Sequence, residues 1–356
     1  MDSRTRLADR QTEISLLPGL SLQQFLQECR ENHPRLYRCL DPDRMFSELG
    51  LEFYRGLRHV SQHFEREEKG GRGGAYRKAQ LGNPLIRSRG IQRLFKLACG
   101  SSGFSPRTQV VDVLGGNGTL CRAMRLLHEP ESCPTIFTSD ASQDMVADAL
   151  RQRIPAVRQP AQYMMLRDGC VDGLIFAYGT HHIPSDELSG ALKEAHRVLR
   201  PDGRVVLQDF ETGTPTARWY SEILHRYTET GHDFEHFTPQ SIRHLLEEAG
   251  FEDVQIHRVY DPCIVQESNP EQARLRLLDY LISLFSLNKL LPEDGVKDEA
   301  FWDRAEEVVR SCSTFSPAEL PGEVETVTEL AVSADSAGYR AELPRVALVG
   351  TGRRRD

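Results

Sequence analysis

The middle of the chain alternates short apolar runs with longer amphipathic segments, and this alternation restricts the fold more than any other feature. The segments between the runs, among them 143–153 and 185–199, carry apolar residues at helical spacing. Strands that alternate with helices of about 10–15 residues indicate βαβ units, and so a mostly parallel sheet with right-handed crossovers. The apolar runs that we predict as strands are 108–114, 135–139, 171–178 and 204–210.

The flanking regions are predicted to be mainly helical. Before the alternating region we expect helices at 20–29, 43–57 and 84–99, with a glycine-rich flexible loop at 67–76. We therefore divide the chain into an N-terminal helical cap at 1–104, which helps to form a substrate pocket, and an α/β core at 105–356. The core carries a helical insertion at about 266–335. Its further elements are predicted as helices at 239–249, 270–312 and 323–334 and strands at 254–259 and 345–349.

Composition excludes several classes of protein. With 39% hydrophobic and 27% charged residues, the chain is expected to be globular and not disordered. Its formal charge of −8 argues against nucleic acid or an anionic membrane as the main partner. The most apolar stretch, 277–291, is short and contains Asp279, Asn288 and Lys289, so it is not expected to span a membrane.

The eight cysteines and the first ten residues bear on the compartment. The cysteines are scattered and form no CxxC pair, which excludes a zinc ribbon and indicates buried thiols in a reducing environment. The first ten residues are polar and lack the apolar core of a secretion signal. These two observations predict a cytoplasmic protein.

A glycine-rich turn and a later acid are the strongest chemical signals. The run from Asp112 to Gly118 takes a predicted strand into the turn Gly115-Gly116-Asn117-Gly118 and then into a helix. Glycines let the backbone approach a ligand closely, but the spacing fits a dinucleotide fingerprint poorly, and a simple connecting turn stays open. Asp140 ends the next strand, where an acid can accept hydrogen bonds from ribose hydroxyls or merely cap a helix. Together the two signals are more specific than either alone.

Four blocks in order resemble the class I S-adenosylmethionine-dependent methyltransferases of the small-molecule type. The resemblance covers about 105–260 closely and 345–350 more loosely. It implies a Rossmann-like, seven-stranded, mostly parallel sheet with an antiparallel last strand and helices on both faces. The cofactor is expected across the carboxyl ends of the strands. The blocks that carry the resemblance are 112–118, Asp140, 166–184 and 195–203.

The resemblance also implies the residues that bind S-adenosylmethionine. The glycines pass beneath the methionine part, Asp140 holds the ribose and Met145 covers the adenine. Many relatives have an acid after the third strand, but this chain has 159–162 (QPAQ), where Gln162 or a backbone group is expected to take its place. The full set of expected cofactor-binding residues is Asp112, Gly115, Gly116, Asn117, Gly118, Asp140, Ala141, Met145, Gln162 and Tyr178.

Methyl transfer from this cofactor is an in-line displacement that needs an aligned nucleophile and the management of one proton. Candidate bases follow the fourth and fifth strands, and two more histidines lie further along. For each of them a packing, capping or solvated role stays open. The candidates are His181, His182, Asp209, Glu211, His232 and His236.

A metal site is the alternative for some of these residues. His232 and His236 are four residues apart, and with Asp209 or Glu211 they provide two histidines and a carboxylate. Some ketoacid methyltransferases of this family use iron in this region. Pocket lining or packing is the preferred interpretation, so we expect no metal.

These observations predict a methyltransferase acting on a small organic molecule, in specialised (natural-product) metabolism. The acceptor atom stays open among carbon, oxygen and nitrogen. Three alternatives remain: cyclisation or rearrangement without net methylation, a non-catalytic binding or scaffold protein, and a nucleotide-dependent oxidoreductase. We expect no nucleic acid or membrane partner. The apolar stretch 277–291 is expected either to roof the pocket or to contact a second copy in a homodimer.

Overall fold

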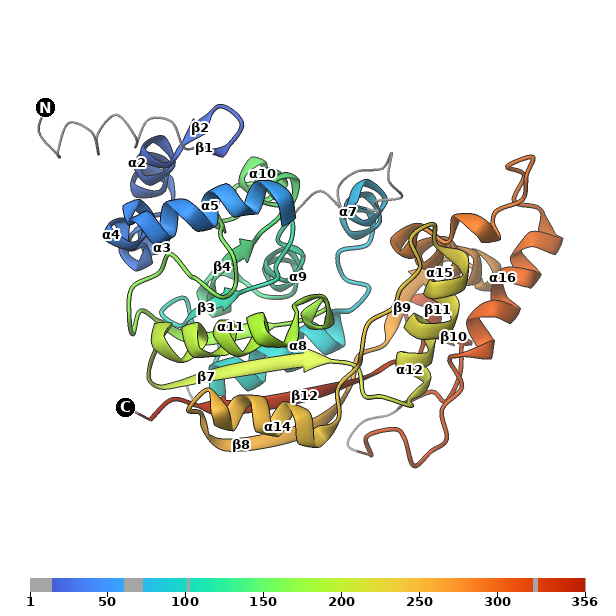
Figure 1. Ribbon diagram of the computed structural model, residues 1–356. Helices are drawn as coiled ribbons and strands as arrows, with labels where there is room; N and C mark the ends of the chain where they lie inside the picture. Colours follow the sequence, from blue (N-terminus) through green and yellow to red (C-terminus); the bar gives the residue numbers. More distant parts are fainter. Residues whose placement is uncertain (1–14, 61–72, 101–102, 323–325, 356) are drawn as a thin grey trace, which may run out of the picture.

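The computed structural model describes residues 15–60, 73–100, 103–322 and 326–355 (Figure 1). Its centre is a seven-stranded sheet of order β5-β4-β3-β6-β7-β12-β8. Neighbouring strands from β5 to β7 pair in parallel, whereas β12 pairs antiparallel with both β7 and β8. This topology confirms the predicted Rossmann-like fold. The strands are β3 (Gln109–Asp112), β4 (Thr135–Asp140), β5 (Ala156–Arg158), β6 (Val171–Phe176), β7 (Leu199–Asp209), β8 (Glu252–Tyr260) and β12 (Val346–Arg353).

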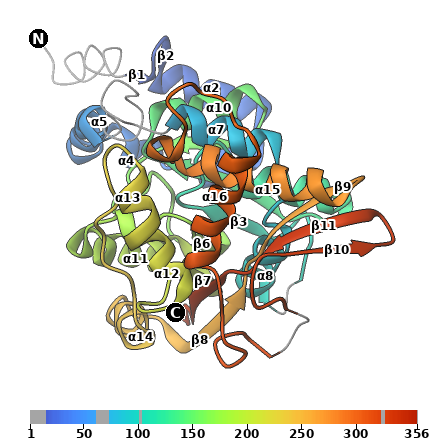
Figure 2. The ribbon, with the colours of Figure 1, turned by 90° about the vertical axis from the view of Figure 1, so that its right-hand side faces the viewer.

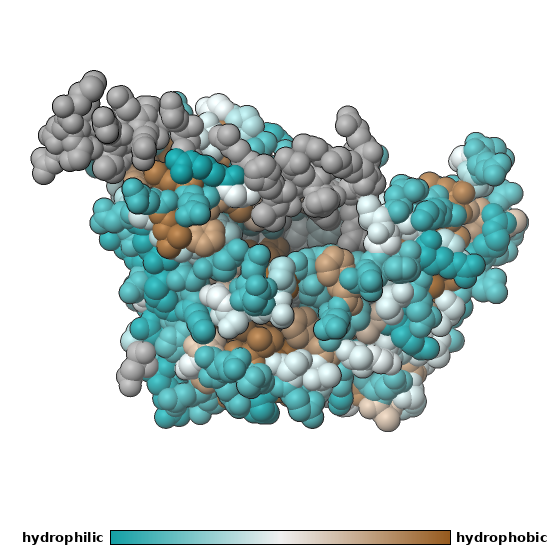
Figure 3. Space-filling view, in the orientation of Figure 1, coloured by the Kyte–Doolittle hydropathy of each residue, from teal (hydrophilic) through white to brown (hydrophobic). Residues whose placement is uncertain are grey.

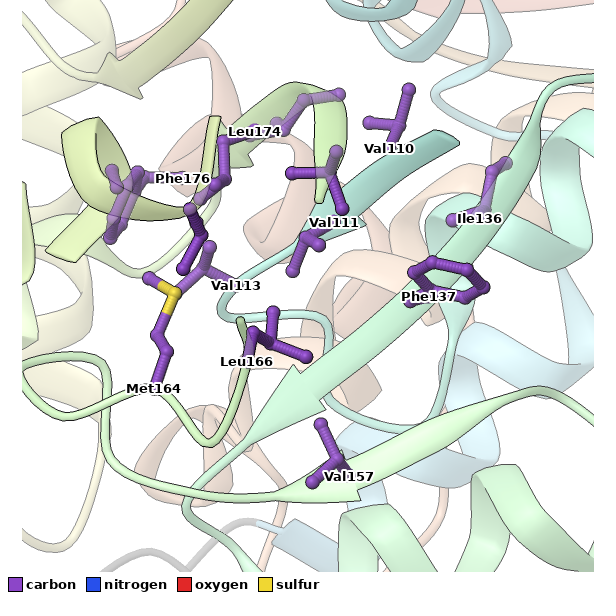
Figure 4. Packing of buried hydrophobic residues seen from close by; sticks show 14 of the residues in the cluster. Val110, Val111, Val113, Ile136, Phe137, Val157, Met164, Leu166, Leu174 and Phe176 are labelled. Carbon is purple, nitrogen blue, oxygen red and sulfur yellow. The ribbon is translucent and has the colours of Figure 1, made fainter. Parts of the chain in front are cut away.

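The central strands are apolar because both faces of the sheet are covered by other elements. Val110 and Val111 of β3 and Leu174 of β6 are all at most 1% exposed. Figure 4 shows Ile136 and Phe137 of β4 packed beside them. Parallel strands buried on both faces read as continuous apolar runs, which is why these segments were predictable as strands.

Helices cover both faces of this sheet (Figure 1). α8 (Ser88–Cys99) packs against β6, β7 and α9 (Thr119–Leu127), and α14 (Pro239–Glu248) packs against β8, β12 and α11 (Ser185–Val198). Thr238 caps α14 by accepting a hydrogen bond from the backbone N–H of Ser241. In α11 the capping position is Pro184, and Ser185 is already helical.

The predicted N-terminal cap divides among three places. In the first part, up to residue 60, β1 contacts α10 (Gln143–Arg151). Arg44 donates to the carbonyl of Met164, in the segment after β5, and pairs with Glu194 of α11 at 2.9 Å. α7 (Gly73–Gly82) packs instead on the distant α15, and α8 is part of the sheet covering. The first part comprises β1 (Ser15–Leu17), β2 (Leu20–Ser21), α2 (Leu22–Asn32), α3 (Pro34–Cys39), α4 (Pro42–Phe46) and α5 (Glu48–Val60).

Two details of this region differ from the sequence predictions. The helix expected at 43–57 is broken into α4 and α5 at Ser47, which has extended backbone angles and ends α4. Of the glycine-rich loop expected at 67–76, residues 67–72 lie outside the described part of the chain. Gly73 to Tyr76 form the first turn of α7, where packing on α15 outweighs the low helix propensity of glycine.

The segment between β8 and β12 forms a subdomain with its own apolar cluster (Figure 2). From here on we call this subdomain the cap, as distinct from the N-terminal helical cap predicted from the sequence. The cap is only partly helical. The helix predicted at 323–334 is wrong in its described part, because Ala331–Asp335 is a strand that pairs with the strand Gly338–Leu343. Since the side chains of this strand are mostly exposed, it had no alternating apolar signal. The cap contains β9 (Cys263–Glu267), α15 (Pro270–Phe285), η6 (Asn288–Leu290), α16 (Glu299–Ser311), β10 (Ala331–Asp335) and β11 (Gly338–Leu343), ordered β10-β11-β9 in an antiparallel sheet.

The most apolar helix of the chain, α15, is buried within the chain itself. Leu277, Leu278 and Leu281 are at most 1% exposed, and α15 contacts α7, α16, β9 and β11. This burial removes the reason for invoking a dimer partner to cover it. None of the described helices is long and apolar enough to cross a membrane. On the face shown in Figure 3, apolar side chains form small groups among hydrophilic ones.

Two chain segments connect the core with the cap, and a third segment, which links α7 to α8, lies beside them; we call the place where they meet the junction. It comprises residues 86–87, 261–263 and 344–345. The N–H of Ile264 donates to the carbonyl of Ile86 at 2.8 Å, and the N–H of Asp261 donates to the carbonyl of Arg345 at 2.9 Å. The junction lies where β8 leads into β9 and where β11 leads into β12.

Candidate cofactor and catalytic site

The glycine turn lies at the carboxyl end of β3. Gly116 and Gly118 have φ angles of +53° and +81°, a region that side chains with a Cβ rarely adopt. A Cβ on Gly115 would lie 2.7 Å from Oδ2 of Asp112. Glycine is therefore required by backbone angle at two positions and by space at the third, and Gly118 is the residue directly before α9.

Asp140 ends β4 beside this turn, and backbone groups hold its carboxylate. The N–H of Gly116 donates to Oδ2 at 2.9 Å, and the N–H of Ser142 donates to Oδ1 at 2.8 Å. A carboxylate has about four lone-pair positions, so each oxygen can still accept a hydroxyl. The two strongest sequence signals are thus in direct contact in the structure.

Asp112 is buried behind the same turn. It is 1% exposed, and neither of its carboxylate oxygens has a hydrogen-bond partner among the described residues. Burial, followed by the negative charge of Asp140, raises the pKa of Asp112 to about 8. A buried acid without a partner is costly, and a ligand with a positively charged N–H donor would relieve that cost.

Other expected cofactor residues also surround the turn. The Met145 side chain is buried, and its sulfur lies 3.8 Å from the position of a Cβ on Gly116. Asn117 accepts hydrogen bonds from Thr119 and Arg122 through Oδ1, while its buried Nδ2 has no partner among the described residues. The carbonyl of Ala141 accepts from Arg158 at 3.0 Å.

Two expected cofactor residues are directed elsewhere. Gln162 donates to Glu187 of α11 at 2.9 Å, and the hydroxyl of Tyr178 donates to Asp261 at the junction at 3.2 Å. The sequence analysis missed Gln159. Gln159 is 1% exposed and connects the edge of the sheet by donating to Ser139 and accepting from the N–H of Met165. Its position directly after β5 was the available signal.

The residues at this edge fit S-adenosylmethionine. Asp140 would accept from the ribose hydroxyls, the glycine turn would accommodate the methionine part, and Met145 would lie against the adenine. The unpaired carboxyl of Asp112 and the unpaired Nδ2 of Asn117 are the buried polar atoms that such a polar, cationic ligand would satisfy. When bound, the group supplies a methyl on a positively charged sulfur.

A buried imidazole–carboxylate pair lies at the ends of the two neighbouring strands. Nδ1 of His181, after β6, is 3.0 Å from both oxygens of Asp209, which ends β7. Asp209 also accepts from the backbone N–H groups of His181 and Phe210, each at 2.8 Å. Because a carboxylate only accepts, Nδ1 of His181 carries a proton, and in the neutral imidazole Nε2 then holds the lone pair. Asp209 therefore orients His181 and is not itself placed as the base.

The other candidate bases differ in their exposure and in their hydrogen-bond partners. Nε2 of His232 is 3.2 Å from Nε2 of His181, and His232 is 3% exposed. His182 is exposed, with its ring 4.5 Å from that of Phe234. Glu211 is held by Arg258 through two hydrogen bonds of 2.7 Å, so the structure does not support it as a base.

His236 lies beside this pair without joining it. Its ring is 5.7 Å from that of His181, and both ring nitrogens are buried without a hydrogen-bond partner among the described residues. Burial and the nearby His181 lower the pKa of His236, against the opposing effect of Asp209. The imidazole of His236 is therefore held neutral at neutral pH.

The described residues also include one histidine cluster with spacing suitable for a metal ion. The ligand atoms of His181, His182 and His232 lie within 4.8 Å of one another. Two nitrogens bound to one tetrahedral zinc ion lie about 3.4 Å apart, close to the His181–His232 separation. This set differs from the expected one, since His236 is not among its members and Asp209 is bound to His181. The cluster can hold either a shared proton or a divalent cation.

Aromatic rings enclose the histidines. Tyr220 stacks on Phe210 with ring centroids 4.4 Å apart and lies 5.6 Å from His181. Phe234 is 42% exposed and lies 4.8 Å from His232. His181 and Asp209 are themselves buried, at 7% and 1% exposed, which strengthens the electrostatic effect of Asp209 on His181.

Comparisons with known proteins identify a methyltransferase domain in this chain. A family profile described as "Methyltransferase domain" matches residues 77–256. The chain is 28% identical over 155 residues to demethylmenaquinone methyltransferase of Mycolicibacterium gilvum, covering 43% of this chain and 64% of that protein. It is 31% identical over 142 residues to a ubiquinone/menaquinone biosynthesis C-methyltransferase of Methylobacterium nodulans, covering 38% and 55%. The match thus spans less than two thirds of these relatives.

Solved structures also align with this chain, at low sequence identity. Phosphoethanolamine N-methyltransferase 2 of Haemonchus contortus aligns with a TM-score of 0.49 and 13% identity, over 83% of this chain and 60% of that one. The YcgJ protein of Bacillus subtilis aligns with a TM-score of 0.44 and 16% identity, over 76% and 98%. The family match covers half of the chain, including β3, β4, the glycine turn and Asp140. The chain therefore belongs to the methyltransferase domain family, whose cofactor is S-adenosylmethionine.

Proposed function

We propose that this protein transfers a methyl group from S-adenosylmethionine to a small organic molecule, with His181 as the base. The observation that carries the proposal is the buried His181–Asp209 pair, which lies at the same sheet edge as the Asp140-braced glycine turn. β6 and β7 follow β3 in the sheet order, so both groups face the space beyond the carboxyl ends of neighbouring strands.

In this mechanism the chain supplies orientation and a proton acceptor. Asp209 fixes the tautomer of His181 and stabilises the imidazolium that forms when Nε2 takes a proton from the acceptor. His232 lies within hydrogen-bond distance of that nitrogen and can share the charge. The rings of Phe210 and Tyr220 exclude water from the pair.

We also propose the substrate class and the setting. The cap and its aromatic rings are suited to an organic acceptor, and we place the acceptor in specialised metabolism. The curated relatives named for menaquinone and ubiquinone methylation match only 43% and 38% of the chain, so quinols are the second substrate class to test. All eight cysteines are free, which supports a reducing cytoplasm as the compartment.

The test uses S-adenosylmethionine with an isotopically labelled methyl group and a panel of phenols, amines, ketoacids and naphthoquinols. A product heavier by one methyl group supports transfer, whereas product formation without label supports cyclisation or rearrangement. We expect His181→Ala to lower kcat by about 10²–10⁴-fold, the usual contribution of a general base, with little change in cofactor affinity. His244→Ala, on the exposed face of α14, is the matched control.

The same assay separates the two uses of the histidine cluster. Because the proposed base needs no ion, activity is expected to survive exhaustive treatment with EDTA. Loss of activity on chelation and its return with one divalent metal would instead assign His181, His182 and His232 as ligands. Unchanged activity in His181→Ala would contradict the assignment of the base.

A further inference from the structure

Two buried arginines at the junction have fewer carboxylates near them than would balance their charge. Arg87 is 4% exposed and Arg345 is 7% exposed. Arg87 directly precedes α8, and Arg345 directly precedes β12. Buried arginines are normally paired with carboxylates, because an unpaired buried charge is costly.

The partners of Arg87 are aromatic and not acidic. Its guanidinium carbon lies 4.8 Å from the centre of the Tyr178 ring. Its Nε is buried and has no hydrogen-bond partner among the described residues. No carboxylate in the described chain lies within ion-pair distance of it.

Arg345 has only weak partners as well. Its Nη1 lies 3.7 Å from the sulfur of Cys263, and its Nη2 lies 3.9 Å from Oδ2 of Asp261. That separation is too long for a hydrogen bond, and both Nη2 and Oδ2 lack a hydrogen-bond partner among the described residues. The guanidinium also lies 5.5 Å from the centre of the Phe210 ring.

Asp261 is the single carboxylate between them. It is 2% exposed and accepts a hydrogen bond from the Tyr178 hydroxyl. Burial raises the pKa of Asp261, and the charges of Arg345 and Arg87 oppose that shift, so both guanidinium groups act on it. Two cations and one carboxylate leave one positive charge in excess. The hydroxyl of Tyr280, from α15, is a further buried group without a partner among the described residues.

The arginines adjoin the candidate catalytic site. The Phe210 ring lies near both places. The Arg345 guanidinium is 5.5 Å from its centre, and the His181 ring is 6.0 Å from it between ring centroids. Tyr178, which carries Arg87 on its ring, is three residues before His181. Arg345 also lines a small cavity of about 20 Å³, whose other lining residues include Trp219, Leu281 and Phe285. That volume has room for a group about the size of one water molecule beside the Arg345 charge.

We propose that Arg87 and Arg345 bind a carboxylate of the methyl acceptor, so that the substrate is an organic monoacid held at the junction between core and cap. A monoanion matches the single excess charge, and a planar carboxylate matches the fork of a guanidinium. The Tyr280 hydroxyl is a third donor for the same group. The assignment of this anion as the methyl acceptor rests on the proposed function, but anion binding by the two arginines does not.

The test measures binding of acetate and benzoate to the full-length protein saturated with S-adenosylhomocysteine, in a chloride-free buffer at constant ionic strength. Acetamide and benzamide are the neutral partners of the same shape. We expect each carboxylate to raise the melting temperature, and each amide to leave it unchanged. Arg87→Met and Arg345→Met are expected to weaken carboxylate binding at least tenfold. Arg89→Met is the matched control, because Arg89 also lies over an aromatic ring and is 3.6 Å from Glu342.

Unfolding by urea separates a binding role from a structural one. Because each arginine is buried without a close counter-charge, replacing it with methionine is expected to leave the urea midpoint of the ligand-free protein unchanged or raise it. A large drop in the midpoint would show that the arginines hold the cap on the core, and would overturn the proposal. Arg87→Lys and Arg345→Lys keep the charge without the fork and are expected to bind carboxylates weakly.

Three results contradict the inference. They are equal binding of acid and amide, carboxylate binding that survives both methionine substitutions, and binding of inorganic phosphate or phenyl phosphate at least tenfold tighter than that of the carboxylates. Failure of the wild-type protein to bind S-adenosylhomocysteine would count against the proposed function. The same anion titrations without S-adenosylhomocysteine still test the arginines, so the two failures are distinguishable.

Discussion

A single acid, Asp112, makes stability depend on pH in an unusual direction. Its pKa is raised from 3.8 to about 8, so in the folded protein the carboxyl keeps its proton where the unfolded chain has lost it. The native state therefore binds more protons than the unfolded state between about pH 4 and 8. The contribution of this group to stability is fully present below pH 4 and is lost as the pH rises through that window.

We expect Asp112→Asn to remove this dependence. The difference in urea midpoint between wild type and variant is expected to change steadily in favour of the variant from pH 5 to pH 8, in the absence of cofactor. Denaturation series at four pH values measure it, with the exposed Asp186→Asn as the control. A difference that is the same at pH 5 and pH 8 would show that Asp112 is ionised in the fold.

Individual residues differ in how far the sequence predicts their role. Asp140 and the three glycines were predictable, because backbone geometry at a strand end fixes where they lie. Tyr178 and Gln162 were not, because side-chain direction decides their role and the sequence pattern does not report it. Tyr178 has a φ angle of +60°, and its ring turns to Asp261 at the junction.

At the scale of elements, the contact between β12 and α14 depends on a missing side chain. A Cβ on Gly350 would lie 2.2 Å from Cγ2 of Ile242 and 2.9 Å from Cδ1 of Leu246. We expect Gly350→Ala to destabilise the protein by about 1–3 kcal/mol, because α14 would have to move away from the sheet. Equilibrium unfolding in urea measures the change.

Gly56→Ala is the matched control for this substitution. Gly56 lies in α5, and a Cβ there meets nothing within 4 Å. Alanine is therefore expected to stabilise the protein by about 0.5–1 kcal/mol through the lower entropy of the unfolded chain. If both substitutions had the same sign, the close packing of α14 on β12 would be contradicted.

Elements of the core were more predictable than those of the cap. In the buried parallel strands and the amphipathic helix α11, the pattern of hydrophobic residues along the sequence follows from which side chains are buried. β10 is largely exposed and α7 begins with two glycines, so neither has a local pattern matching its structure. Contacts with distant segments, such as α15, determine them.

At the scale of the whole molecule, cofactor binding is expected to stabilise the entire fold. S-adenosylhomocysteine at a hundred times its Kd should add about 2.7 kcal/mol and raise the melting temperature by several degrees. NAD is expected to have no effect, because the glycine spacing does not fit a dinucleotide. Differential scanning fluorimetry measures both.

Asp140→Ala is expected to abolish most of the shift, since it removes hydrogen-bond acceptors to the ribose and releases the N–H groups of Gly116 and Ser142. Asp144→Ala, on an exposed part of α10, is the control. A full shift in Asp140→Ala would place the cofactor elsewhere, and a shift with NAD would restore the oxidoreductase alternative.

The cap also determines how the core sheet is completed. β12 fills the place between β7 and β8, although the whole cap separates it from β8 in sequence. Closing so long a disordered loop costs on the order of 4 kcal/mol of chain entropy. Pairing of β9 with β11 sets Cys263 opposite Leu343, and three residues further on Tyr260 faces Val346. Once the cap has formed, the register of β12 is therefore already fixed. β12 can then pair with the core strands residue by residue, starting at the junction.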